Sequence, residues 1–326
     1  MHPNYTDQTD SRVSTNGGSR WLALGLALTL VVGPLSSPAY PSSEKKRAKA
    51  YRDINAIGHR VIGYPYGAGN WYSLDKEKEL GTQVSATFEK SIFLLRDSMT
   101  ESYLDRLGQV IARNSDAQLP ITIRVIDSED SYFLTLLGGH QYVTRGLLLQ
   151  LQNEGELAAA IARGVAHTAL RSATGELTRS NLIKLTTVTG VFVGPGGVAN
   201  GTADSALGVP VTFLHFSRED ESAADYFGVQ YLYKGGYDPD CFIGFIQKAW
   251  PASSKTTATA FSPFPPLPER LKAVEREISE ILPKRAGAIT STEEFAAFRE
   301  HLLNLPAPKP VPKVPTLLRS DTQKLN

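Results

Sequence analysis

Residues 153–171, NEGELAAAIARGVAHTALR, constrain the fold of this chain more than any other segment. The segment is rich in alanine, and larger apolar side chains recur one helical turn apart at Leu157, Ile161 and Val165. This spacing predicts a helix with one buried side. Arg163 and His167 are also one turn apart, so their side chains leave the same face of that helix.

The spacing of Arg163 and His167 is the one at which zincin peptidases present two zinc ligands. In their pattern His-Glu-x-x-His, both imidazoles bind one zinc ion and the glutamate lies beside the metal-bound water. Here the pattern is broken, because arginine and glycine stand at its first two positions. Taken alone, His167 is more simply explained as a hydrogen-bonded histidine on a half-buried helix.

The rest of the chain predicts a mostly helical fold with a small sheet. Apolar residues recur at helical spacing in two stretches within residues 73–113. Residues 121–127 alternate apolar with polar side chains and residues 140–145 follow a Gly-Gly turn, so we expect two neighbouring strands. From Gly146 onward the pattern is mainly helical. The expected class is therefore α+β.

The start of the chain has the composition of an export signal. Residues 21–33 form an apolar run that follows Arg12 and Arg20 and precedes the small-residue stretch PLSSPAYPSS. The run is shorter than the roughly 20 residues of a membrane-spanning helix, so we interpret residues 1–39 as a signal peptide, with an uncleaved anchor as the alternative. Either interpretation predicts a periplasmic or other extracytoplasmic protein.

Composition also marks the expected domain boundaries and loops. We interpret residues 40–70 as a linker that wraps the surface of a domain at residues 71–304. The Pro- and Lys-rich tail, residues 305–326, is expected to be extended and disordered. The sequence does not decide whether this tail contacts a membrane or the cell wall. The Gly-rich segment 190–208 and the Pro-rich segment 263–268 are expected to interrupt the helices, the first as a loop near a cleft.

Charge and cysteine content exclude two classes of function. The net charge is +1 and no window interleaves dense basic residues with aromatic ones, so we expect no nucleic-acid partner. The single cysteine, Cys241, has no partner for a disulfide, a redox pair or a thiolate metal site. Cysteine chemistry is therefore not the main activity.

Five segments together are similar to one protein family. They are WYSLDKEKELG, YLDRLGQVIAR, VIDSEDSYFLTLLGGHQYVTRGLL, NEGELAAAIARGVAHTALR and, most clearly, FSREDESAADYFGVQYLYKGGYDP. Over roughly residues 72–300 the chain resembles zinc metallopeptidase family forty-eight, which includes the CAAX prenyl protease, the mitochondrial stress protease and bacterial envelope quality-control proteases. The resemblance implies a zincin-like fold.

The resemblance also implies a role for five positions. The family's first zinc histidine falls on Arg163, its catalytic glutamate on Gly164 and its second zinc histidine on His167. Its third zinc ligand, a glutamate, falls on Glu221, and the aspartate that supports a ligand histidine falls on Asp225. Two of the three motif residues on the first helix are therefore replaced.

These replacements predict a loss of zinc binding and of hydrolysis. A guanidinium stays protonated and offers no lone pair, so Arg163 repels a metal ion. Gly164 has no side chain to take a proton from metal-bound water. Relatives often carry Asn, Pro and His at three further positions, which here are Tyr132, Leu137 and Phe264.

Two alternatives to this assignment stay open. Glu221 and Asp225 lie in an acidic run, SREDESAAD, which can also be a solvated helix face. We favour an inward-pointing Glu221, because residues typical of close packing follow it at Ala223, Ala224, Phe227 and Gly228. In addition, His140 or His215 can in principle replace the missing zinc ligand.

The residues favour a pseudo-peptidase that binds polypeptides in the cell envelope without cutting them. Its cofactor would be zinc if any, and we expect none. In the family an edge strand lies beside the substrate, so we assign His140, Gln141 and Tyr142 to the substrate groove. The alternative is an active zinc metalloendopeptidase of envelope protein quality control, and the sequence leaves enzymatic activity uncertain.

The loss of zinc predicts what replaces it. Two carboxylates without a counter-charge would be costly to bury. We therefore expect Arg163 to point into the former metal site and to pair with Glu221, while Asp225 stays near His167.

Overall fold

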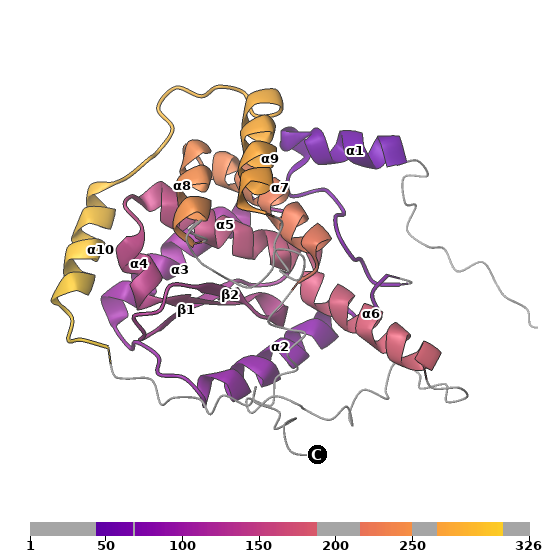
Figure 1. Ribbon diagram of the computed structural model, residues 1–326, viewed down its shortest axis with the longest axis horizontal. Helices are drawn as coiled ribbons and strands as arrows, with labels where there is room; N and C mark the ends of the chain where they lie inside the picture. The colour runs from indigo at the N-terminus through magenta and orange to yellow at the C-terminus, as the bar shows by residue number, and fades with distance from the viewer. Residues whose placement is uncertain (1–43, 68, 188–215, 250–265, 309–326) are drawn as a thin grey trace, which may run out of the picture. The chain divides into compact units, whose positions relative to one another are not determined.

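The computed structural model describes residues 44–67, 69–187, 216–249 and 266–308 (Figure 1). The expected signal peptide, the Gly-rich segment and the tail beyond residue 308 lie outside these ranges. The described part confirms an α+β fold that is mostly helical. Its elements are α1 (Glu44–Arg52), η1 (Ile54–Ala56), α2 (Leu74–Glu89), α3 (Ser98–Arg113), β1 (Thr122–Ile126), β2 (Phe133–Thr135), η2 (Leu137–Gly139), β3 (His140–Thr144), α4 (Arg145–Gln150), α5 (Glu154–Leu170), α6 (Ser172–Thr187), α7 (Arg218–Lys234), α8 (Asp240–Ala249), α9 (Leu267–Glu280) and α10 (Glu293–Asn304).

The sheet has the strand order β1-β3-β2. The two predicted strands, β1 and β3, are parallel neighbours, with Thr122 opposite His140. The sequence did not predict β2, which is only three residues long and runs antiparallel to β3. The outer edge of β1 is covered, because Leu95 N–H donates to the Val125 carbonyl and Asp127 N–H donates to the Phe93 carbonyl. The outer edge of β2 pairs with no strand in the described ranges.

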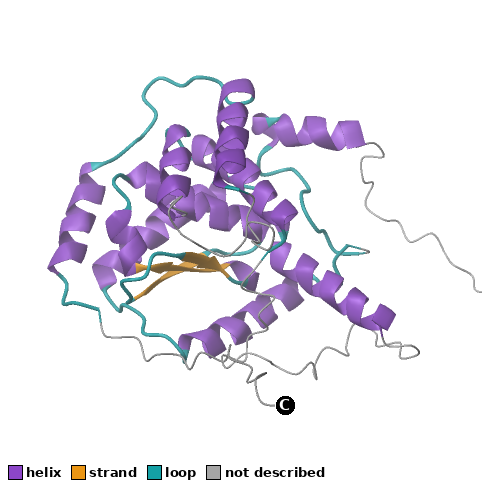
Figure 2. Cartoon of the chain, viewed as in Figure 1, coloured by secondary structure: helices purple, strands orange, loops and turns teal. Residues whose placement is uncertain are grey.

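The sheet lies between α2 and α5, as Figure 2 shows. Successive side chains of a strand point to opposite faces. On β3, Tyr142 therefore faces α2, where its ring meets that of Phe88 at a centroid distance of 4.9 Å. Val143 faces the other way, into the main core around α5. Residues of β3 next to each other in sequence thus belong to different environments.

α5 is buried along its whole length, which the Ala-rich sequence permits because small side chains let neighbouring helices come close. α7 runs beside it, and the closest approach is at Gly228. A Cβ atom there would be 3.1 Å from the Cα atom of Arg163. Both helices begin with a side-chain cap, since Asn153 accepts the Glu156 N–H and Ser217 accepts the Asp220 N–H. The helix predicted over residues 153–171 is confirmed, with α5 spanning Glu154–Leu170.

The segment expected as a surface linker, residues 40–70, differs from that expectation in its described part. Residues 44–52 form α1, and the apolar side chains of Ile57 and Ile62 are buried in the main core. Arg60 is also buried. The sequence suggested a linker because the segment is mixed in charge and rich in Tyr, Gly and Pro, but Arg60 donates to Gln230 on α7 and the Tyr64 hydroxyl accepts from Arg179 on α6. The domain therefore includes this segment.

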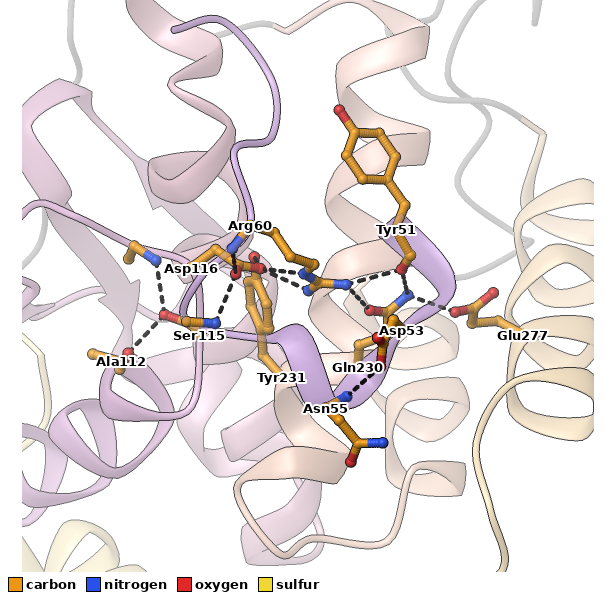
Figure 3. A network of polar contacts seen from close by, with 12 residues as sticks. Tyr51, Asp53, Asn55, Arg60, Ala112, Ser115, Asp116, Gln230, Tyr231 and Glu277 are labelled. Carbon is orange, nitrogen blue, oxygen red and sulfur yellow. Dashed lines mark hydrogen bonds and ion pairs between the residues drawn. The ribbon is translucent and has the colours of Figure 1, made fainter. Parts of the chain in front are cut away.

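A buried polar network fastens this segment to the helices (Figure 3). The Arg60 guanidinium donates to the Asp116 carboxylate at 2.6 and 3.0 Å and to Gln230 Oε1 at 2.8 Å. Tyr231 donates to Asp116 at 2.8 Å, and Gln230 Nε2 donates to Glu277 at 2.7 Å. Since Asp116 follows α3, Gln230 and Tyr231 are on α7 and Glu277 is on α9, one network joins four parts of the chain that are distant in sequence.

The chain beyond α10 is anchored where it leaves the domain. Arg145 donates hydrogen bonds to the main-chain carbonyls of Leu302 and Leu305. The expected tail therefore begins at a fixed point, although most of it lies outside the described residues. Within the described ranges, no helix has the length and apolar character needed to cross a bilayer.

We predict that Asp116→Ala lowers the free energy of unfolding by about 3–5 kcal/mol, because it leaves the Arg60 guanidinium buried without its anion. Urea denaturation followed by circular dichroism measures the change. Glu280→Ala is the matched control, since it breaks the exposed pair with Arg52 and should cost at most about 1 kcal/mol. Equal effects of the two variants would contradict this role of the network.

Candidate functional site

The side-by-side packing of α5 and α7 gathers four of the predicted site residues in one place (Figure 1). Arg163 and His167 come from α5, and Glu221 and Asp225 come from the first half of α7. All four are buried, with exposed fractions of 2–6%. The alternative of a solvated acidic face therefore does not hold for Glu221 or Asp225, because α7 turns this side toward α5.

Arg163 points into the site and contacts both carboxylates. One guanidinium nitrogen forms an ion pair with Glu221 Oε2, as the sequence predicted. Its Nε donates to Asp225 Oδ1 at 3.0 Å. Burial lowers the pKa of Arg163 to about 10, so the side chain is still charged at neutral pH. A permanent cation therefore occupies the centre of the site.

Asp225 is placed differently from the prediction. It was expected near His167, but its carboxylate is held by two arginines. Arg270 on α9 donates to Asp225 Oδ2 through Nε at 2.7 Å and, through a terminal nitrogen at 2.9 Å, to the same Oδ1 that Arg163 contacts. The geometry is bidentate, which gives a strong and well-oriented ion pair. Because both oxygens are satisfied by guanidinium groups, Asp225 does not orient the imidazole.

Sequence reasoning missed Arg270 altogether. It lies in LPERLKAVEREISE, where charged residues alternate with apolar ones as on any amphipathic surface helix. Its 3% exposed fraction was the only distinguishing feature, and that is a property of the tertiary structure. With Arg270 included, two arginines balance two carboxylates. The buried cluster of Arg163, Glu221, Asp225 and Arg270 therefore has no net charge, and we refer to it as the ion cluster.

His167 lies beside the ion cluster as a neutral side chain. Its Nε2 is 3.7 Å from Glu221 Oε2, and its ring stacks on Phe216 at a centroid distance of 4.2 Å. Its Nδ1 is 3.4 Å from the Ser172 hydroxyl. Burial, together with the positive charges of Arg163 and Arg270, holds the pKa of His167 well below its usual 6.5. The imidazole is consequently uncharged at neutral pH.

The residues of the site do not fit a zinc ion. A catalytic zinc takes three protein ligands, whereas only His167 and Glu221 face each other here. Within the described residues, no three His, Cys, Asp or Glu side chains form a metal-binding group. Moreover, the Glu221 oxygen that faces His167 is the one that the Arg163 guanidinium contacts. The atom that zinc would need is thus bound by a fixed cation.

Gly164, at the position of the family's catalytic glutamate, has no room for a side chain. A Cβ atom there would be 2.7 Å from the Phe133 ring and 2.8 Å from the carboxamide of Gln141. Such distances are well inside van der Waals contact. A side chain at position 164 therefore requires the Phe133 ring and the Gln141 carboxamide to move.

The groove prediction requires a correction, because β3 is the central strand and not an edge. Gln141 is buried against α5, next to Gly164. Tyr142 donates to Glu89 at 3.0 Å on the opposite face. His140 also belongs to that face, and its Nδ1 is 3.0 Å from the Thr122 hydroxyl. His140 therefore points away from α5 and cannot replace the missing zinc ligand.

Among the described strands, the outer edge of the sheet near the site belongs to β2. Leu136 N–H donates to the His140 carbonyl, and Thr144 N–H donates to the Tyr132 carbonyl. Since main-chain groups along an antiparallel strand face its neighbour at every second residue, those of Phe133 and Thr135 face away from β3. These groups are the ones that an added strand can pair with.

The remaining predicted positions are spread over the surroundings. Tyr132 precedes β2 and is 38% exposed, whereas Leu137 is buried in η2. Pro266 is the N-cap residue that precedes α9. His215 and Phe264 lie outside the described residues.

Comparison with known proteins agrees with this arrangement. The model of Peptidase family M48 matches residues 98–278, which is more than half of the chain and includes α5, α7 and Arg270. The chain belongs to peptidase family M48. The motifs in the sequence had predicted this membership, and the match to the M48 model confirms it.

Among the M48 relatives is the beta-barrel assembly-enhancing protease of Yersinia pestis, which is 23% identical over 235 residues, or 70% of this chain and 46% of the relative. The protein of the same name in Escherichia coli is 22% identical over 189 residues, or 56% of this chain and 39% of the relative. The chain thus spans less than half the length of these curated relatives.

We predict that Arg163→Ala lowers the free energy of unfolding by about 3–5 kcal/mol, because it leaves Glu221 buried without a counter-charge. Chemical denaturation measures this change. Arg106→Ala removes an arginine from an exposed pair with Glu294 and should change the stability by about 1 kcal/mol or less. A small effect of Arg163→Ala would show that the ion cluster does not stabilise the contact between α5 and α7.

Zinc binding can be tested by placing a histidine at position 163, so that it forms, together with His167 and Glu221, the ligand set expected from the family. Arg163→His removes the guanidinium and adds an imidazole one turn before His167, so we expect measurable zinc binding in competition with a chromogenic chelator. Arg163→Gln is the control, since it removes the charge without adding a ligand and should bind no zinc. If both variants bind zinc equally, the site assignment is wrong.

Adding Gly164→Glu to Arg163→His should not improve the site. The new side chain collides with Phe133 and Gln141, so we expect a further loss of about 1–3 kcal/mol in stability, measured by denaturation. A double variant that is as stable as Arg163→His alone would show that the space around Gly164 opens readily.

Proposed function

We propose that this chain is a non-hydrolytic M48 protein that binds extended polypeptide segments and carries no catalytic zinc. The observation that carries the proposal is the position of the Arg163 guanidinium, which contacts Glu221 and Asp225 where the family places its metal. Arg163 and Arg270 balance the two carboxylates, so the site needs no added cation to neutralise it.

The described residues also provide no group suited to activate water. Gly164 has no side chain, and the carboxamide of Gln141 beside it does not titrate at any relevant pH. The carboxylates of the ion cluster are engaged by arginines and so are poorly placed to accept a proton from water. His167 is neutral and buried. In the family's reaction a metal ion lowers the pKa of the attacking water, so His167 without a metal ion is not expected to deprotonate a water molecule.

Peptide binding needs none of these groups. The outer edge of β2 offers the main-chain N–H and C=O groups of Phe133 and Thr135. An extended peptide can pair with them as an additional strand, in the manner of β-augmentation. The other edge of the sheet is covered by residues 93–95, so β2 is the edge that supports this proposal. The proposed groove is accordingly beside β2 and not along β3.

The name shared by the relatives suggests a class of client. They are called beta-barrel assembly-enhancing proteases, and β-barrel proteins present extended strands before they assemble. We therefore include unassembled β-barrel proteins of the cell envelope among the proposed clients. The apolar run at residues 21–33, interpreted as a signal peptide or anchor, supports an extracytoplasmic location.

An active zinc metalloendopeptidase is the second candidate. Family membership favours it, as does the separation of 3.7 Å between His167 Nε2 and Glu221 Oε2. This function would require Arg163 to leave the site and another residue to act as general base. The contacts of Arg163 with two buried carboxylates make such a movement costly.

Metal content and turnover distinguish the two candidates. We expect the purified full chain, incubated with zinc and then desalted, to carry far less than one zinc ion per molecule by mass spectrometry. We also expect it to bind fluorescein-labelled β-casein without cleaving it. The Escherichia coli relative serves as the positive control for cleavage. Near-stoichiometric zinc, together with casein cleavage that a chelator abolishes, would establish the enzyme and refute the pseudo-peptidase.

A further inference from the structure

A cavity of about 880 Å³ is bounded by α1, α7 and α9, which lie next to one another in Figure 1. None of its described lining residues belongs to the sheet. Its apolar walls include Tyr51, Tyr226, Phe227, Val274 and Ile281. Sites for small molecules have roughly this volume and are lined mainly by apolar and aromatic side chains with a few polar groups. The cavity is therefore large enough for a small organic ligand.

The charged side chains around this cavity do not balance. Among the described residues, three arginines and four acidic residues line it. Arg52 pairs with Glu280 at 3.4 Å, and Arg270 is held by Asp225 at 2.7 Å. With every group ionised, one negative charge is in excess, so the cavity is better suited to a cation than to an anion.

Outside these two ion pairs, Glu277 is the buried acidic residue of the described lining, with an exposed fraction of 5%. Its Oε1 accepts a hydrogen bond from Gln230 Nε2 at 2.7 Å, and Figure 3 shows its other carboxylate oxygen directed away from Gln230. Burial raises the pKa of Glu277 to about 7, although nearby groups act in the opposite direction. These groups are Gln230, Arg52, Arg276 and Arg60. The ionised carboxylate is thus incompletely stabilised, and a cationic group in the cavity would stabilise it.

Aromatic rings beside Glu277 add to the attraction for a cation. Burial and the nearby carboxylate of Glu277 raise the pKa of Tyr226 to about 12. The Tyr226 side chain is partly exposed, and its ring meets that of Phe227 edge-on at a centroid distance of 5.1 Å. Tyr51 also packs edge-on against Phe227, at 5.1 Å. The negative faces of such rings attract an ammonium group, and their apolar surface favours the carbon chain attached to it.

We propose that this cavity is a binding site for small organic amines, in which the ammonium group of the ligand pairs with Glu277 and its apolar part lies against Tyr226 and Tyr51. The ligand class is defined by one positive charge joined to an apolar chain or ring. The site is separate from the polypeptide binding proposed above, because its described lining comes from the helices and not from β2.

Pairing with Glu277 makes binding depend on pH. The ligand pairs with the ionised carboxylate, so its apparent affinity follows the ionised fraction. With a pKa of about 7, this fraction rises about tenfold between pH 6 and pH 8. The other groups that face Glu277 are Gln230, the Tyr226 phenol and the three guanidinium groups named above, and none of these changes its charge in this range.

The test follows the binding of dansylcadaverine, a fluorescent primary amine, to the purified full chain by fluorescence titration. We expect the affinity at pH 8 to be about tenfold higher than at pH 6. The N-acetylated form of the probe keeps the apolar part but carries no charge. It should bind about tenfold more weakly at pH 8, with no difference between the two pH values.

Glu277→Gln tests the assigned residue. Its carboxamide oxygen can still accept the hydrogen bond from Gln230, so we expect the network to persist while the amine binds about tenfold more weakly at pH 8 and without pH dependence. Glu275→Gln is the matched control, since it removes an exposed carboxylate from the same helix and should leave the affinity unchanged.

Thermal unfolding shows whether Glu277→Gln keeps its fold. The pKa of Glu277 is raised in the folded chain, so the stability that its protonated form contributes is lost as the pH rises through 7. Glutamine avoids this loss, and the variant should melt at pH 8 at no lower temperature than the unchanged chain. Equal affinity of the unchanged chain for the amine and its acetylated form, or for the amine at both pH values, would show that Glu277 selects no cation. Absence of binding would refute the site.

Discussion

The ion cluster between α5, α7 and α9 is the interaction on which the site and the packing of these helices depend. Arg163 joins Glu221 to Asp225, and Arg270 closes the arrangement from α9. Each charge would be costly to bury alone, and together they neutralise one another. The close approach of α5 and α7 at Gly228 lets Arg163 on α5 reach Glu221 and Asp225 on α7. The ion pairs therefore require the small residues between these two helices.

The same cluster explains how an M48 fold persists with an altered motif. In a zinc site the metal supplies the positive charge that holds helices and acidic ligands together. Here two guanidinium groups supply it. Burial, together with their charge, keeps the pKa of His167 low, so the imidazole stays neutral beside them. In the function proposed above, the two arginines thus take over the structural role of a metal ion.

The fold and much of the site followed from local patterns. Helical periodicity located α2, α3 and α5, and the spacing of Arg163 and His167 on one helix face gave their shared direction. Other features could not be found in this way. β2 is too short to show a period, Arg270 resembles any charged residue of an amphipathic helix, and Arg60 lies in a segment with the composition of a linker.

The sequence by itself determined the family and the α+β class, because these depend on residue identity and on spacing within single helices. Only the tertiary structure decided which strand is the edge, which arginine holds Asp225 and what fills the space at Gly164. Each of these is a contact between segments distant in sequence. Burial, strand order and the pairing of charges are set by how the elements pack, and no local pattern of residues encodes that choice.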